Sequence, residues 1–180
     1  KGKRFNKYIK GNKANDKIVK YLPHGLNHNI YRPLETTEEI DAMEKMKLDL
    51  FGKDEVNFCL FFNSRNIRRK QIPDSMWAFR IFLDSLPKEK ADKCRFLLHT
   101  ELVHEAGTDL PVINELLFAD KYPNAIVFDT KKWSTPELNI LYNISDCQIL
   151  LTSNEGWGLT LTEAMLAGNP IIANVTGGMQ

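Results

Sequence analysis

Residues 147–175 read CQILLTSNEGWGLTLTEAMLAGNPIIANV, and this stretch decides which fold the sequence predicts. Its first six residues, 147–152, are a short apolar run of the kind that forms a buried parallel strand. A loop containing Glu155 follows, and apolar residues then recur at helical spacing until Gly168 and the proline behind it end the helix. Residues 171–175 predict another strand, so the stretch forms one strand–helix–strand unit.

The same alternation of strand and helix runs through the rest of the chain. Further strands are predicted at 18–22, 56–62, 95–100 and 125–128, and helices at 36–50, 74–86, 110–119 and 136–144. Two of the helices begin with a capping box, Thr36 with Glu39 and Ser134 with Glu137. Such alternation predicts an α/β fold, a Rossmann-like doubly wound parallel sheet with helices on both faces.

Glu155 and Glu163 bracket the glycine-rich turn between the strand and its helix. Gly156 and Gly158 allow a ligand to approach the backbone, and the first free amides of a helix attract phosphate. Carboxylates are poor phosphate ligands but good acceptors for sugar and ribose hydroxyls. One loop could therefore hold both ends of a nucleotide sugar. Taken singly, each acid could equally be a solvated surface residue.

The string EGWGLTLTEAMLAGNPIIA, residues 155–173, resembles the signature of retaining GT-B glycosyltransferases of family four. The resemblance implies that Glu155 contacts the donor sugar and that Glu163 holds the ribose hydroxyls. It also implies that the intervening loop binds the donor diphosphate through its backbone, with substrate-binding positions Gly156, Trp157, Gly158, Leu159 and Thr160.

A second motif follows the predicted strand at 56–62, where the chain reads NSRNIRRKQ over residues 63–71. In the resembled family an Arg, and a Lys five residues later, grip the donor diphosphate, and Arg65 and Lys70 have this spacing. An Arg fork and a Lys point charge would stabilise the departing diphosphate electrostatically. We therefore predict Arg65, Lys70 and Glu155 as catalytic residues.

The chain departs from the family pattern at several of these positions. Ser64 and Gln71 replace glycines that usually flank the Arg and the Lys, and Arg68 or Arg69 could take over a role. His99 ends a predicted strand where the family more often has glycine, and we interpret it as structural.

Two further segments bear on ligand binding. Gly25 lies in a turn that resembles the family's loop facing the interdomain cleft, which makes it a candidate substrate-binding residue. Residues 129–133 replace a Gly-containing loop near the nucleobase, which leaves the base open. His24 and His28 flank Gly25 in the same loop, where a helical metal pair is not expected.

Composition permits this interpretation and excludes others. The 180 residues are 43% hydrophobic, and 24 Lys plus Arg nearly balance 23 Asp plus Glu, so no bulk charge recruits nucleic acid or a membrane. The first twenty residues alone are strongly basic. Three cysteines without CxxC spacing indicate buried thiols in a reducing, cytoplasmic setting. No apolar run approaches about eighteen residues, and the charged start is not a signal peptide.

The sequence predicts one domain with an attached segment. Residues 1–17 are expected to be a linker or the end of a missing N-terminal domain, and residues 18–180 a donor-binding domain truncated at its C-terminus. The predicted function is the donor-binding part of a glycosyltransferase that moves a sugar from a nucleoside diphosphate sugar to an acceptor hydroxyl, without metal or cofactor. The acceptor could be a sugar, a lipid, a protein or another hydroxyl compound. The alternatives are a non-catalytic nucleotide-binding or interaction module and a GT-B epimerase or phosphorylase.

Overall fold

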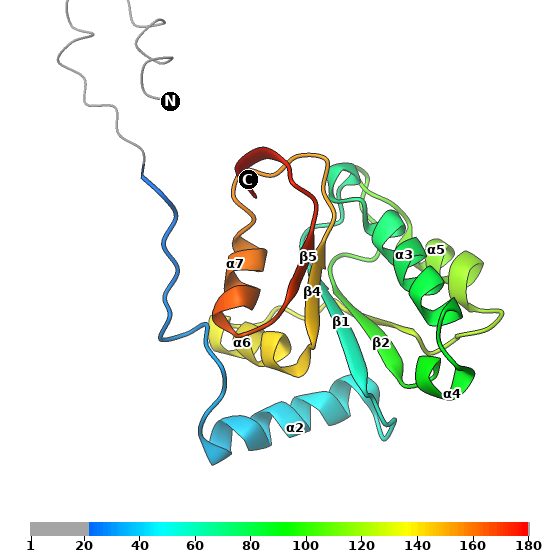
Figure 1. Ribbon diagram of the computed structural model, residues 1–180, viewed down its shortest axis with the longest axis horizontal. Helices are drawn as coiled ribbons and strands as arrows, with labels where there is room; N and C mark the ends of the chain where they lie inside the picture. The colour runs from blue at the N-terminus through cyan, green and yellow to red at the C-terminus, as the bar shows by residue number, and fades with distance from the viewer. Residues whose placement is uncertain (1–21, 180) are drawn as a thin grey trace, which may run out of the picture.

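The computed structural model describes residues 22–179, and five parallel strands form its central sheet (Figure 1). The strand order is β3-β2-β1-β4-β5. The predicted doubly wound α/β fold is thereby confirmed. The predicted linker at 1–17, the basic start of the chain and all but the last residue of the predicted strand at 18–22 lie outside the described residues. The strands are β1 (Phe58–Asn63), β2 (Cys94–His99), β3 (Ile126–Asp129), β4 (Cys147–Leu150) and β5 (Ile171–Ala173).

Helices cover both faces of the sheet (Figure 1). One face carries α3 (Ile72–Asp84), the short α4 (Lys88–Ala91) and α5 (Leu110–Phe118). The opposite side carries α2 (Thr37–Phe51), α6 (Thr135–Ile144) and α7 (Leu159–Leu166). Two 3-10 turns complete the elements, η2 (Arg68–Lys70) and η3 (Gly177–Met179).

The strand β1 shows how the sequence builds two hydrophobic cores. Side chains alternate across a strand, so Leu60 and Phe62 enter the core beneath α3, whereas Cys59 and Phe61 enter the core shared with α6. All four side chains are at most 5% exposed. A strand buried on both faces reads as a continuous apolar run, which is why residues 56–62 were recognisable.

The helix boundaries follow the local signals where those signals are strong. Both predicted capping boxes form: the Glu39 amide donates to the Thr36 hydroxyl at 3.2 Å, and the Ser134 amide donates to the Glu137 carboxylate at 2.8 Å. The helix predicted at 74–86 instead begins at Ile72, with Pro73 in its first turn, and ends at Asp84. The four-residue α4 was not predicted, because a single turn has no periodicity.

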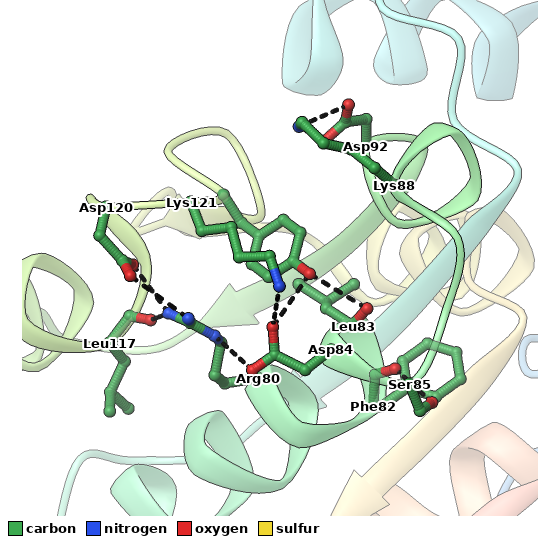
Figure 2. A network of polar contacts seen from close by, with 11 residues as sticks. Arg80, Phe82, Leu83, Asp84, Ser85, Lys88, Asp92, Leu117, Asp120 and Lys121 are labelled. Atoms are coloured by element: carbon green, nitrogen blue, oxygen red, sulfur yellow. Dashed lines mark hydrogen bonds and ion pairs between the residues drawn. The ribbon is translucent and has the colours of Figure 1, made fainter.

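A network of charges fastens α3 to the segment after α5 (Figure 2). The Arg80 guanidinium donates to Asp84 at 2.9 Å and to Asp120 at 2.8 Å, and it also lies 5.3 Å from the Tyr122 ring centre. The Lys121 ammonium donates to Asp84 at 2.6 Å. These contacts join the ends of α3 and α5, which precede β2 and β3. Arg80 therefore provides a control for substitutions at the carboxyl ends of the strands.

Cys59, Cys94 and Cys147 are buried free thiols, as the sequence predicted. Burial raises the pKa of Cys59 to about 12, so this thiol stays protonated. Between residues 22 and 179, the helices are all too short or too polar to cross a membrane.

Candidate functional site

The two predicted motifs meet at the carboxyl ends of β1 and β4, which are neighbours in the sheet although β1 precedes β2 in the chain. The chain direction across the sheet reverses between these strands, and parallel α/β sheets bind ligands at such a switch point. The loops that follow the strands are joined through the Arg69 carbonyl. It accepts hydrogen bonds from the Ser153 amide and the Thr152 hydroxyl, both at 2.9 Å.

Lys70 and Arg69 both bind the Glu155 carboxylate. The Lys70 ammonium donates to Oε2, and an Arg69 guanidinium nitrogen lies 3.0 Å from the same oxygen. The side chains of Lys70 and Glu155 are only 8% and 12% exposed. Burial alone would raise the pKa of Glu155, but the hydrogen bonds from Lys70 and Arg69 lower it below its ordinary value. Glu155 is therefore a charged, fixed carboxylate rather than a solvated loop acid.

Arg65, which the sequence paired with Lys70, lies elsewhere. Its exposed side chain lines a cavity of about 440 Å³ beyond the ends of β1, β2 and β3. Arg69, named in the sequence only as a substitute, is the arginine that contacts Glu155. The buried position of Lys70 comes from η2, whose last turn ends at Gln71 with φ +47°. The family's usual glycine at that position suits this left-handed conformation, and here a glutamine adopts it.

The glycine-rich loop leads into α7 through Gly158, which precedes the helix with φ +82°. Leu159 and Thr160 are the first two helical residues, whose amides have no partner within the helix. Gly156 is exposed, and its amide donates to the Glu155 carboxylate at 3.1 Å. The loop thus presents backbone amides beside the Lys70–Glu155 pair.

The interdomain turn predicted from Gly25 touches this loop through a neighbouring residue. The His24 ring lies edge-on to the Trp157 ring, with 5.4 Å between their centres. Gly25 itself is exposed, and apart from its chain neighbours no atom of the described residues lies within 4 Å of the position where a Cβ would stand. The turn is therefore next to the loop, with His24 as its contact.

Gly177 and Gly178, near the end of the described chain, contact the backbone of the glycine-rich loop. The Gly178 amide donates to the Glu155 carbonyl at 2.8 Å. A Cβ at Gly178 would lie 1.7 Å from the Gly156 carbonyl oxygen, and one at Gly177 would lie 2.0 Å from the Glu155 carbonyl oxygen. Only glycine permits this contact between the two backbones.

Glu163 lies on α7 and is bound to Tyr142 of α6. The Tyr142 hydroxyl donates to Glu163 Oε2 at 2.5 Å and accepts from the Asn63 amide group at 3.0 Å. Tyr142 is completely buried, whereas Glu163 is half-buried. Asn63 is the last residue of β1 and also lines the cavity that contains Arg65. Through Tyr142, these contacts link Glu163 of the first motif to Asn63, the first residue of the second motif.

Asp129, a buried carboxylate at the end of β3, lines the same cavity. Asp129 Oδ2 lies 2.8 Å from His99 Nδ1 and accepts from the Trp133 indole at 2.6 Å. Burial opposes ionisation of Asp129, but the hydrogen bonds from His99, Trp133 and Lys131 lower its pKa. Thr100 also lines the cavity, and its buried hydroxyl has no hydrogen-bond partner among the described residues. His99 is structural in part, as the sequence indicated, yet its ring also borders the cavity.

Sequence reasoning missed Tyr142, Asn63 and Asp129. Tyr142 lies on the apolar side of a predicted helix, where a tyrosine is most simply interpreted as core. Asn63 and Asp129 each close a strand, and polar residues at the carboxyl ends of several strands were the one signal that could have grouped them.

Comparisons with known proteins agree with this fold. Residues 118–180 match the family model of the glycosyl transferases group 1. The chain is 29% identical over 155 residues to the alpha-monoglucosyldiacylglycerol synthase of Acholeplasma laidlawii, an alignment that covers 84% of this chain and 34% of that protein. This chain thus spans about a third of its curated relative.

Solved structures give the same result. The C-terminal domain of a glycosyl transferase group 1 family protein from Francisella tularensis superposes with a TM-score of 0.67 and 17% identity, over 86% of this chain and 73% of that one. An Escherichia coli structure described as trehalose-6-phosphate bound with UDP-2-fluoro glucose superposes with a TM-score of 0.62 and 14% identity, over 84% of this chain and 35% of that one.

The solved structures show the fold of this chain, and the family match covers its last third. The described region has the Rossmann-like fold of the C-terminal domain of a GT-B glycosyltransferase. Residues 118–180 carry the sequence pattern of the glycosyl transferases group 1, and the resemblance seen in residues 155–173 is confirmed.

Proposed function

We propose that this chain binds a nucleoside diphosphate sugar across the carboxyl ends of β1 and β4, as the donor side of a retaining glycosyltransferase. The observation that carries the proposal is the Lys70–Glu155 ion pair at the switch point of the sheet, where Tyr142 also links Glu163 to Asn63 at the end of β1. Lys70 comes from the loop after β1, whereas Glu155 and Glu163 come from the loop after β4 and the helix that follows it. Their convergence favours one polyhydroxylated, anionic ligand.

The diphosphate would lie between Lys70 and the amides that begin α7. An ammonium group has three hydrogen-bond donors, so Lys70 can hold Glu155 and a phosphate oxygen together. The amides of Leu159 and Thr160 point from a helix N-terminus, which favours a negative charge. Arg65 would approach the same diphosphate from the cavity that it lines. Preorganised donors of this kind stabilise charge as it develops on the leaving group.

Glu155 would orient the sugar rather than attack it. Its carboxylate is paired with two cations, and such pairing lowers the nucleophilicity of the oxygen that is bound. In the proposed reaction the bond from the anomeric carbon to the diphosphate oxygen breaks, and its electron pair stays on the diphosphate. The acceptor oxygen bonds to the anomeric carbon on the same face, and its proton passes to the departing phosphate oxygen.

The nucleoside would extend from Glu163 into the cavity beside His99. Glu163 would accept the ribose hydroxyls, and the His99 ring would face the base. The substitution His99→Phe places a larger ring in the cavity. It should weaken UDP binding and leave pyrophosphate binding unchanged, because pyrophosphate has no base. Equal weakening of both ligands would place the base elsewhere.

The donor and acceptor identities follow only in part from this site. The name of the Acholeplasma relative indicates glucosyl transfer to a lipid, and the E. coli structure is described with a UDP-2-fluoro glucose ligand, so UDP-glucose is the first donor to test. We expect acceptor groups from a second domain, since the chain spans 34% of its curated relative. The reaction is proposed to need no metal or cofactor, and the cytoplasmic setting stays a prediction.

Calorimetric titration of the 180-residue chain with UDP, GDP and ADP tests the donor site. At least one nucleotide should bind, with the same affinity in the presence of EDTA. The Arg80→Ala variant is the control, because the contacts of Arg80 with Asp84 and Asp120 (Figure 2) join helix ends that precede β2 and β3, so the variant should affect stability only. No binding of any of the three would overturn the proposal.

A non-catalytic nucleotide-binding module is the second candidate function. Such a module would bind the nucleotide and would not need to discriminate a sugar-bearing donor from the bare diphosphate. Tighter binding of UDP-glucose than of UDP, lost in Glu155→Gln, favours the transferase. An epimerase or a phosphorylase would instead release an altered sugar or consume phosphate, which product analysis detects.

A further inference from the structure

The Glu163 carboxylate is bound by a buried tyrosine, Tyr142. Tyr142 donates to its Oε2 at 2.5 Å from a fully buried position. Burial, and after it the negative charge of Glu163, raise the pKa of Tyr31 to about 12. The two tyrosine rings stand edge-to-face, with 6.1 Å between their centres. The Glu163 carboxylate is thus bound by the Tyr142 hydroxyl from the core, and Tyr31 packs against the Tyr142 ring.

The direction of the hydrogen bonds around Tyr142 is determined by Asn63. The Asn63 amide nitrogen can only donate, so the Tyr142 oxygen accepts from it at 3.0 Å. The single proton of the Tyr142 hydroxyl is then directed at Glu163. Burial and the negative charge of Glu163 raise the pKa of Tyr142, so the hydroxyl remains a donor at any ordinary pH.

The ring of Tyr142 is fixed independently of its hydroxyl. It packs edge-to-face on Phe61, with 5.3 Å between the ring centres. A phenylalanine would fill the same space without a polar atom to satisfy. Packing alone therefore does not account for the Tyr142 hydroxyl, which is buried and donates to the half-buried Glu163 carboxylate.

We propose that Tyr142, oriented by Asn63, is a positioning residue that fixes the Glu163 carboxylate so that its other oxygen accepts the ribose hydroxyls of the donor. This inference rests on the proposed function, and it assigns the role to a residue outside the recognised motif. A carboxylate offers about four lone-pair sites on two oxygens, so occupation of Oε2 leaves Oε1 free for hydroxyls. Holding the carboxylate in one rotamer lowers the ordering cost on binding.

The test compares nucleotides with and without ribose hydroxyls. UDP, GDP and ADP and their 2′,3′-dideoxy forms are titrated against the wild type and Tyr142→Phe by calorimetry. The wild type should prefer the ribonucleotide, and this preference should fall roughly tenfold in Tyr142→Phe, as for loss of a hydrogen bond to a charged group. Affinity for the dideoxy form should stay the same. Glu163→Ala defines the preference that remains without the carboxylate.

The outcomes separate the possible explanations. Equal weakening of both nucleotide forms in Tyr142→Phe would mean a structural role only, and an unchanged preference would overturn the proposal. Asn63→Ala, which removes the donor that orients the Tyr142 hydroxyl, gives a second measurement with a smaller expected fall, should Tyr142→Phe fold poorly. Arg80→Ala must lower the melting temperature without changing the preference. A wild type that binds ribo and dideoxy forms equally would overturn the assignment of Glu163 and, with it, that of Tyr142.

Discussion

Lys70 and Glu155 are 85 positions apart in the sequence and form an ion pair that is almost completely buried. Each residue follows a different strand, and the two strands are neighbours only because β4 is placed next to β1 in the sheet. The pair therefore joins the two motifs that the sequence could only assign separately. Its burial also explains why removing one partner should have a large effect.

Replacing Lys70 should remove the main cation of the proposed diphosphate site. We expect Lys70→Ala to weaken UDP, GDP or ADP binding roughly 10- to 100-fold, since a charge-assisted hydrogen bond in a partly buried site is lost. Calorimetry measures this change, and Arg80→Ala is the control for stability. Affinity within about twofold of the wild type would contradict the role of Lys70.

Gly178 should not tolerate a side chain. A Cβ there would lie 1.7 Å from the Gly156 carbonyl oxygen, so Gly178→Ala must push the tail away from the loop. We expect a loss of about 1–3 kcal/mol in the free energy of unfolding, together with weaker nucleotide binding. Thermal unfolding gives the first quantity. Gly25→Ala is the matched comparison for stability, because nothing lies within 4 Å of its Cβ position. Equal melting temperatures for the two variants would disprove the close backbone contact between Gly178 and Gly156.

Gln71 has a strained backbone that glycine would relieve. Its φ is +47°, in the left-handed region that costs a non-glycine residue roughly 1–2 kcal/mol. Glycine loses part of this gain through its greater freedom in the unfolded chain. Gln71→Gly should therefore raise the free energy of unfolding by about 0.5–1 kcal/mol, as measured by urea denaturation. Gln71→Val, whose branched side chain suits this region less well, should lower it.

Stability should fall in acid because several carboxylates are hydrogen-bonded in the folded state. The pKa of Asp84 is lowered from 3.8 to about 2, first by Lys121 and then by Arg80. The pKa of Glu155 is also lowered. Such groups contribute stability above their unfolded pKa and lose it as the pH falls through the folded pKa. The free energy of unfolding should thus decline from about pH 4.5 toward pH 2. Asp84→Asn should flatten this decline, and an identical slope would refute the assignment.

Local sequence signals predicted most of the fold. The apolar runs, the capping boxes at Thr36 and Ser134, and the glycine after α7 lie within a few residues of the structure they specify, so they can be read directly. Spacing likewise singled out Glu155 and Glu163. The placement of α4 and the first residue of α3 escaped prediction, because a single turn and a helix start have weak local signals.

By itself, the sequence determined the doubly wound α/β fold and the strand–loop–helix unit around Glu155. Only the tertiary structure decided that Arg69 joins Lys70 at Glu155, that Arg65 lines the neighbouring cavity, and that Tyr142 holds Glu163. The physical reason is the range of the forces involved. Hydrophobic periodicity acts between residues a few positions apart, whereas these contacts depend on which strands become neighbours in the folded sheet.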